Sequence, residues 1–188
     1  MELDNETKKI LLNLARSAIL SKSKKANLTE EQIVSLPKIA KEKRGGFVTI
    51  HKDGNLRGCI GYILPIYPLY QVVIENGYNA AYLDYRFNEL TKDEFDKIDI
   101  EISVLTIPEK LVYTDYNDLF NKIRPNIDGV IITKNGSSAT FLPQVWEQLP
   151  DKKDFFSNLC LKANLNINEW ENNTLQVETY QAIVFGEK

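Results

Sequence analysis

The sequence has little of the residue types that most often bind metals or cross-link a chain. Its 188 residues include one histidine, His51, and two cysteines, Cys59 and Cys160. A structural zinc site made of Cys and His needs about four such ligands, so these side chains exclude one, although carboxylate-rich metal sites stay open. Two cysteines so far apart, in a chain with no recognisable secretory signal, favour free thiols over a disulfide framework. We therefore predict no metal site and no cofactor.

Long hydrophobic runs and an excess of positive charge are also missing. No stretch approaches the roughly 18 apolar residues of a membrane span, and residues 1–25 have the pattern of an amphipathic helix. The net charge is -3, with 23 basic and 26 acidic side chains, which disfavours a general polyanion binder. We expect a cytoplasmic protein that binds no membrane and has only a weak case for nucleic acid. That case rests on six basic residues: Lys22, Lys24, Lys25, Lys41, Lys43 and Arg44.

The order of the periodic segments predicts the fold class. Helices are expected after a cap at Asp4 or Asn5, and over residues 29–36, 68–81, 116–123 and 155–163. Alternating residues predict two hairpins, at 45–63 and 128–143, and two further strands, at 97–108 and 175–185. The predicted class is α+β, a single domain over residues 1–188 with a largely antiparallel sheet flanked by helices.

The segment Leu56-Arg57-Gly58-Cys59-Ile60-Gly61 is the most unusual in the chain. Glycine weakens the interior of a strand, so Gly58 and Gly61 indicate a bulge, or a close approach by a ligand or by other backbone. Strand alternation places Arg57 and Cys59 on one face, and a nearby guanidinium favours the reactive thiolate. Cys59 is therefore a candidate nucleophile. The alternative is that Cys59 is a small packed residue and that Arg57 makes an unrelated surface contact.

The register of the first hairpin decides which side chains face this thiol. If the turn has two residues, Val48 faces Cys59, and the cysteine then resembles a packed residue. If the loop has three residues, Thr49 faces Cys59 and His51 faces Arg57, which gathers a base, a cation and a thiol on one face. Both registers are open at this point.

Polar residues elsewhere supply further candidates. Asp84 and Arg86 follow a predicted helix and are close enough in sequence to form a local ion pair. Glu101 and Ser103 occupy the polar side of the strand predicted at 97–108, where they border a cleft or meet water. Glu101 is, with His51, a candidate base for a Cys59 nucleophile.

Several motifs of this chain resemble those of one protein family. They follow one another over nearly the whole chain: Gly46-Phe47-Val48-Thr49, Leu56-Arg57-Gly58-Cys59-Ile60-Gly61, Asp84-x-Arg86-Phe87, Ile100-Glu101-Ile102-Ser103-Val104-Leu105, Asp128-Gly129-Val130 and Thr140-Phe141-Leu142-Pro143-Gln144-Val145-Trp146. On these motifs the chain resembles the AMMECR-one domain family, also called AmmeMemoRadiSam system protein A. Tyr62 and Tyr85 depart from the family pattern, which commonly has a Thr and a Pro at these positions.

The resemblance implies an α+β fold with a larger and a smaller subdomain, intertwined, and a cleft near residues 56–61. It implies no settled reaction, but it associates the chain with a Memo-like protein and a radical-SAM enzyme as partners. The candidate residues for binding a small ligand or a partner are Gly58, Gly61, Asp84, Arg86, Ser103 and Gln144. We favour such a binding module over an enzyme that uses Cys59 as a nucleophile or transient acceptor, and over a nucleic-acid-associated factor.

Overall fold

The computed structural model describes residues 2–24 and 28–188, which divide into two compact units. The first unit contains the residues up to Ile107 and those from Ile183 to Lys188, and the second contains Pro108–Ala182. Lys25, one of the six basic residues noted above, lies outside the described residues. Within the described residues, no helix combines the length and the apolar character that crossing a membrane requires.

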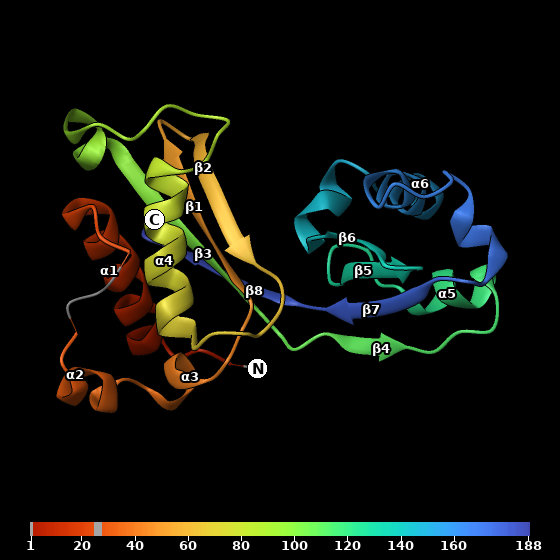
Figure 1. Cartoon of the computed structure of the whole chain (residues 1–188), viewed down its shortest axis with the longest axis horizontal. Helices are drawn as coiled ribbons and strands as arrows, with labels where there is room; N and C mark the ends of the chain where they lie inside the picture. Colours follow the sequence, from red (N-terminus) through yellow and green to blue (C-terminus); the bar gives the residue numbers. More distant parts are fainter. Residues whose placement is uncertain (1, 25–27) are drawn as a thin grey trace. The chain divides into compact units, whose positions relative to one another are not determined.

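The first unit is a four-stranded sheet in the order β2-β1-β3-β8, with helices against one face (Figure 1). Its strands are β1 (Gly46–Lys52), β2 (Asn55–Tyr62), β3 (Ile98–Leu105) and β8 (Ala182–Gly186). Its helices are α1 (Asn5–Ser21), α2 (Glu30–Ser35), α3 (Lys38–Lys41), α4 (Leu69–Tyr82) and the 3-10 turn η1 (Lys92–Lys97). β1 pairs antiparallel with β2, as the predicted hairpin requires, and also with β3.

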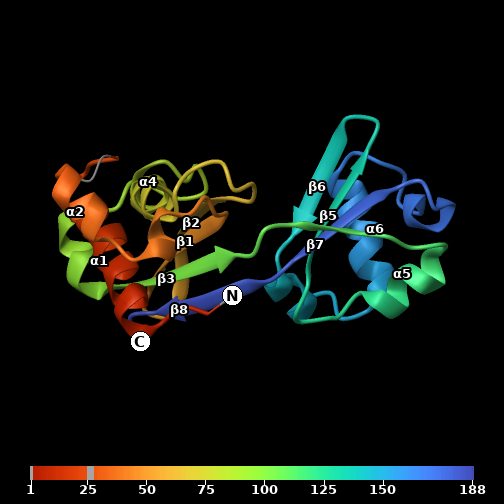
Figure 2. The same ribbon diagram turned by 90° about the horizontal axis from the view of Figure 1, so that it is seen from below.

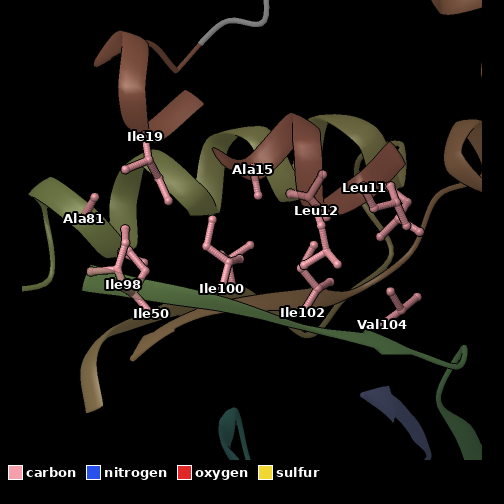
Figure 3. Close-up of a cluster of buried hydrophobic side chains, with 14 of the residues drawn as sticks. Leu11, Leu12, Ala15, Ile19, Ile50, Ala81, Ile98, Ile100, Ile102 and Val104 are labelled. Carbon is pink, nitrogen blue, oxygen red and sulfur yellow. The ribbon is translucent and has the colours of Figure 1, made fainter. Parts of the chain in front are cut away.

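The core of this unit lies between the sheet and the pair α1 and α4 (Figure 3). α1 begins at the cap Asp4, whose side chain accepts from the backbone N–H of Thr7. Every second residue of β3 from Ile98 to Val104 is buried against the helices, as strand alternation predicts. Because these positions face the helices, the residues between them face the opposite side of the sheet. That opposite side carries Glu101 and Ser103 of β3.

The second unit is a four-stranded sheet in the order β4-β7-β5-β6. Its strands are β4 (Glu109–Leu111), β5 (Gly129–Lys134), β6 (Ser137–Phe141) and β7 (Gln176–Tyr180). Its helical elements are α5 (Tyr116–Lys122), η2 (Pro143–Glu147), α6 (Lys152–Lys162) and η3 (Glu169–Asn172). Trp146 is fully buried and stacks on Phe155 with ring centroids 3.6 Å apart. Cys160 is also fully buried in this core, as its helical pattern predicts.

The α+β prediction and both hairpins are confirmed, but the last predicted strand is divided. Residues 175–185 form two strands, and β7 pairs in the second sheet whereas β8 lies beside β3 in the first (Figure 2). The alternation that begins at Leu175 gives way to a continuous apolar run, Ala182-Ile183-Val184-Phe185, but this local pattern does not say which sheet each segment joins. The chain therefore returns to the first unit for its last strand.

Candidate functional site

A β-bulge sets the geometry of the hexapeptide in β2. At the turn, Lys52 lies opposite Asn55, and Asp53 and Gly54 have φ values of 52° and 77°, as a two-residue hairpin loop requires. Beyond Ile50 the register shifts, so that Thr49 lies opposite Cys59. The pairs at the turn thus have the register expected for a two-residue loop. The pairs from Ile50 onward have the register expected for a three-residue loop. Arg57 is the extra residue that joins them.

The bulge places a thiol, a hydroxyl and a carboxylate in one row across three strands. Thr49 pairs with Cys59 of β2 on one side and with Glu101 of β3 on the other. The Thr49 hydroxyl donates to the Cys59 sulfur, with Oγ1 and Sγ 3.3 Å apart. All three side chains are half-buried and lie on the face opposite α1 and α4. We refer to Cys59, Thr49 and Glu101 as the thiol row.

Arg57 does not join this row. Its Nε and Nη2 donate to the two carboxylate oxygens of Glu94, each at 3.0 Å, and Nη1 donates to the carbonyl of Asn88 at 3.0 Å. The expectation that Arg57 shares a face with Cys59 and favours its thiolate is therefore wrong. The bulge breaks the alternation on which that expectation depends, and the buried carboxylate of Glu94 takes the guanidinium.

The predicted ion pair between Asp84 and Arg86 is confirmed, and it holds the backbone of Cys59. The Asp84 carboxylate accepts from the Cys59 N–H at 2.9 Å, and Arg86 Nη2 donates to the Cys59 carbonyl at 3.0 Å. Arg86 also donates twice to Asp84, at 2.9 Å from Nε and 2.6 Å from Nη2. These hydrogen bonds from Arg86, with that from Cys59, hold the pKa of the buried Asp84 carboxyl at about 2. We refer to this arrangement as the Asp84–Arg86 clamp.

Burial decides the charge state of the thiol. It raises the pKa of Cys59 above the ordinary value of 9.0, and the hydrogen bond from Thr49 and the charge of Arg86 oppose this only in part. The charges of Asp84 and Glu101 add to the increase. The thiol of Cys59 is therefore protonated at neutral pH. Burial also raises the pKa of Cys160, in the second unit, to about 11.

The two glycines of the hexapeptide allow close internal packing. A Cβ atom at Gly58 would lie 2.1 Å from the carbonyl oxygen of Ala80, so α4 packs directly on this strand. A Cβ atom at Gly61 would lie 2.3 Å from the ring of Phe47. Both approaches come from the chain itself, so each glycine has a structural reason. Their role in binding a ligand stays a prediction.

The remaining predicted residues lie apart from the thiol row or at its border. His51 pairs with Leu56 and Asp99, two pairs further along the hairpin than Thr49, and does not face Arg57. Ser103 is buried and pairs with Phe47, two pairs from the row on the other side. Gln144 belongs to the second unit, and its Oε1 is buried with no hydrogen-bond partner among the described residues. Over 2–24 and 28–188, no three His, Cys, Asp or Glu residues are grouped as a metal ion would need.

The sequence analysis missed the part that Glu94 plays. Glu94 forms a capping box with Thr91, and its carboxylate accepts from the Thr91 backbone N–H at 3.0 Å. The same carboxylate also binds Lys52 and Arg57. An acidic residue in a capping box gives no signal of partners so distant in the sequence.

Several of the basic residues noted for nucleic acid have partners within the chain. Lys22 pairs with Glu89, Arg44 pairs with Glu42, and Lys41 donates to the carbonyl of Val34. The charge of each is therefore partly balanced within the protein.

Comparison with known proteins agrees with the motifs. The family model described as AMMECR1 matches residues 12–185. A protein of Methanothermobacter thermautotrophicus is 38% identical over 189 residues, covering 98% of this chain and 96% of the relative. A protein of Thermoplasma volcanium is 34% identical over 192 residues, covering 98% of this chain and 95% of the relative.

A solved structure is similar over the whole chain. The crystal structure of the uncharacterized protein PH0010 from Pyrococcus horikoshii matches with a TM-score of 0.86 and 32% identity, covering 100% of this chain and 95% of that chain. The family match extends over most of the sequence, and these relatives share about a third of its residues at nearly full length. The chain therefore belongs to the AMMECR1 family, as the hexapeptide and the other motifs predict.

Proposed function

We propose that this protein is a noncatalytic binding module and that its partner lies on the thiol row of the first sheet. The observation that carries this proposal is the row itself. Cys59, Thr49 and Glu101 place three different polar groups side by side on a face that α1 and α4 leave uncovered. The Asp84–Arg86 clamp fixes the backbone beside them. Such a fixed set of polar groups suits recognition, because little side-chain freedom is lost on binding.

The alternative, in which Cys59 is a nucleophile, has less support from the same geometry. A nucleophilic cysteine needs a lowered pKa or an adjacent base. Burial raises the pKa of this thiol, Arg57 is bound by Glu94, and His51 lies outside the row. Glu101 is the one predicted base in the row, and its negative charge opposes formation of a thiolate beside it.

The proposed partner is a protein of the kind that the family resemblance implies, namely a Memo-like protein acting with a radical-SAM enzyme. Membership of the AMMECR1 family supports this association. The proposed cleft beside residues 56–61 is then the place where the partner meets the thiol row. The alternative occupant of the thiol row is a small ligand.

Binding measurements with variants of the row test this proposal. Thr49→Lys adds a long charged side chain at the centre of the row, and we expect it to weaken binding of the Memo-like protein from the same organism by about tenfold or more. Cys59→Ser keeps the shape of the row, and we expect an affinity within about twofold of the wild type. Isothermal titration calorimetry provides both values.

Thr133→Lys is the matched control for the first of these variants. Thr133 is a half-buried strand threonine of the second unit, on β5, with a hydroxyl 3.1 Å from that of Ser138. The Thr133→Lys variant should bind the partner as the wild type does. Equal affinity of Thr49→Lys and the wild type would contradict the placement on the thiol row. Loss of binding by a folded Cys59→Ser variant would favour the nucleophile alternative.

A further inference from the structure

A surface depression lies beside the hexapeptide in the first unit, outside the thiol row. It has a volume of about 420 Å³ and is lined by Arg57, Tyr85, Arg86, Phe87 and Asn88. We refer to it as the arginine depression. Two guanidinium groups, an amide and a phenol therefore share one small surface, and no carboxylate is among the described residues that line it.

Two buried carboxylates bind the two guanidinium groups, one carboxylate to each. Glu94 binds Arg57 through two oxygens, and Asp84 binds Arg86 through two oxygens. The side chains of Glu94 and Asp84 are 9% and 1% exposed, whereas that of Arg86 is 43% exposed. The carboxylates thus fix the orientation of the guanidinium groups and contribute almost no surface of their own. An arriving ligand meets N–H groups that are already in place.

A count of hydrogen-bond donors shows which N–H groups remain for a ligand. A guanidinium has five N–H donors. Arg57 directs its Nε, both Nη2 hydrogens and one Nη1 hydrogen to Glu94, Glu89 and Asn88. Arg86 directs its Nε and both Nη2 hydrogens to Asp84 and Cys59. One Nη1 hydrogen of Arg57 and both Nη1 hydrogens of Arg86 have no acceptor among the described residues.

We propose that the arginine depression binds an oxyanion, the phosphate or carboxylate group of a small molecule. Planar guanidinium groups with free Nη1 donors match the oxygens of either group. The positive charge of each arginine is balanced by its own carboxylate. The attraction for an oxyanion therefore comes from oriented N–H donors rather than from excess positive charge. We therefore expect weak, saturable binding that depends on the local arrangement of donors. This site shares Arg86 with the Asp84–Arg86 clamp, but it lies outside the thiol row and does not rest on the partner proposed there.

Tyr85 offers a way to test the site without disturbing the fold. Tyr85 is 95% exposed, and its phenol lies near enough to Arg86 to contribute to the raised pKa of the guanidinium. Tyr85→Glu places a carboxylate at the depression, which repels an oxyanion and competes for the free Nη1 donors. Tyr85→Gln introduces a neutral side chain of similar length to Glu and serves as the matched control.

The experiment is a titration of the ¹⁵N-labelled full chain with inorganic phosphate and, separately, with acetate, at constant pH and ionic strength. We expect saturable shifts at the amide signals of residues 84–89 and at the Nε signals of Arg57 and Arg86. Tyr85→Glu should weaken the affinity about fivefold, and Tyr85→Gln should leave it within about twofold. The stronger of the two ligands identifies the phosphate or the carboxylate as the preferred group.

Three results would overturn the inference. These are shifts that never saturate, shifts centred on other basic residues, and equal affinities of Tyr85→Glu and Tyr85→Gln. The variant Thr49→Lys separates this site from the thiol row, because it should bind phosphate as the wild type does while binding the protein partner more weakly. Phosphate binding by the wild type, with no binding of any Memo-like protein, would leave this inference standing and contradict the partner proposal alone.

Discussion

The carboxylate of Asp84 accepts a hydrogen bond from the backbone N–H of Cys59, with 2.9 Å between the two atoms. Cys59 lies on β2, the edge strand of the first sheet, and over residues 2–24 and 28–188 no further strand pairs with its outer side. Asp84 and Arg86 therefore act in place of a neighbouring strand, one accepting from the N–H and the other donating to the carbonyl. The hexapeptide keeps its place because a loop after α4 holds its free edge.

Asp84→Asn should destabilise the first unit measurably. The variant removes the charge that balances Arg86 and weakens the hydrogen bond to Cys59, so we expect a loss of about 2 kcal/mol in the free energy of unfolding. Urea denaturation followed by circular dichroism provides the value. Asp53→Asn is the control, because Asp53 is an exposed turn residue with φ of 52°, a conformation that Asn readily adopts. Equal stability of the two variants would contradict the role of the clamp.

The same carboxyl predicts how stability depends on pH. Its pKa is about 2 in the folded chain against an ordinary value of 3.8, so the folded state favours the ionised form. The stability from this group is complete above pH 3.8 and is lost as pH falls toward 2, to a total of about 2 kcal/mol. Arg57 and Lys52 lower the pKa of Glu94 in the same direction. Unfolding measured from pH 6 to pH 2 should show this loss, and Asp84→Asn should show a smaller one.

The sequence predicted the parts of the fold that depend on local pattern. The alternation from Ile98 to Val104, the cap at Asp4 and the turns of both hairpins are confirmed, because each depends on residues close together in the chain. The division of residues 175–185 into β7 and β8 was not predicted, because the local pattern does not show that the two segments pair in different sheets.

The candidate site was predicted less well, because its contacts cross large sequence separations. Alternation placed Arg57 beside Cys59, but the bulge, and a Glu94 carboxylate that is distant in the sequence, direct the guanidinium elsewhere. The ion pair of Asp84 and Arg86 was predicted correctly from their spacing, whereas its hold on Cys59 was not. The spacing of Asp84 and Arg86 indicates a local ion pair. Its contact with Cys59 depends on the packing of α4 on β2, which the sequence does not show.

Gly58→Ala should disturb the packing of α4 on β2. The new Cβ atom would lie 2.1 Å from the carbonyl oxygen of Ala80, a backbone atom that cannot move without the helix. We expect a loss of about 2 kcal/mol or more in the free energy of unfolding. Gly186→Ala, at the end of β8, is the control. Its Cβ atom would lie 3.3 Å from the nearest atom, so the expected loss is below about 1 kcal/mol. A Gly58→Ala variant as stable as the wild type would show that α4 shifts freely on this strand.

The reactivity of Cys59 should follow its raised pKa. Because burial keeps the thiol protonated at neutral pH, we expect iodoacetamide to modify Cys59 slowly at pH 7 and faster only above pH 9. Peptide mass spectrometry distinguishes this thiol from Cys160, which should stay unmodified in the folded chain because it is fully buried. Thr49→Val removes the hydrogen bond that lowers the pKa of Cys59, so it should slow the reaction further, whereas Thr133→Val, in the second unit, should not change it. Rapid modification of Cys59 near pH 7 would mean that the thiolate is stabilised, and the hypothesis of a nucleophile would then replace that of a binding module.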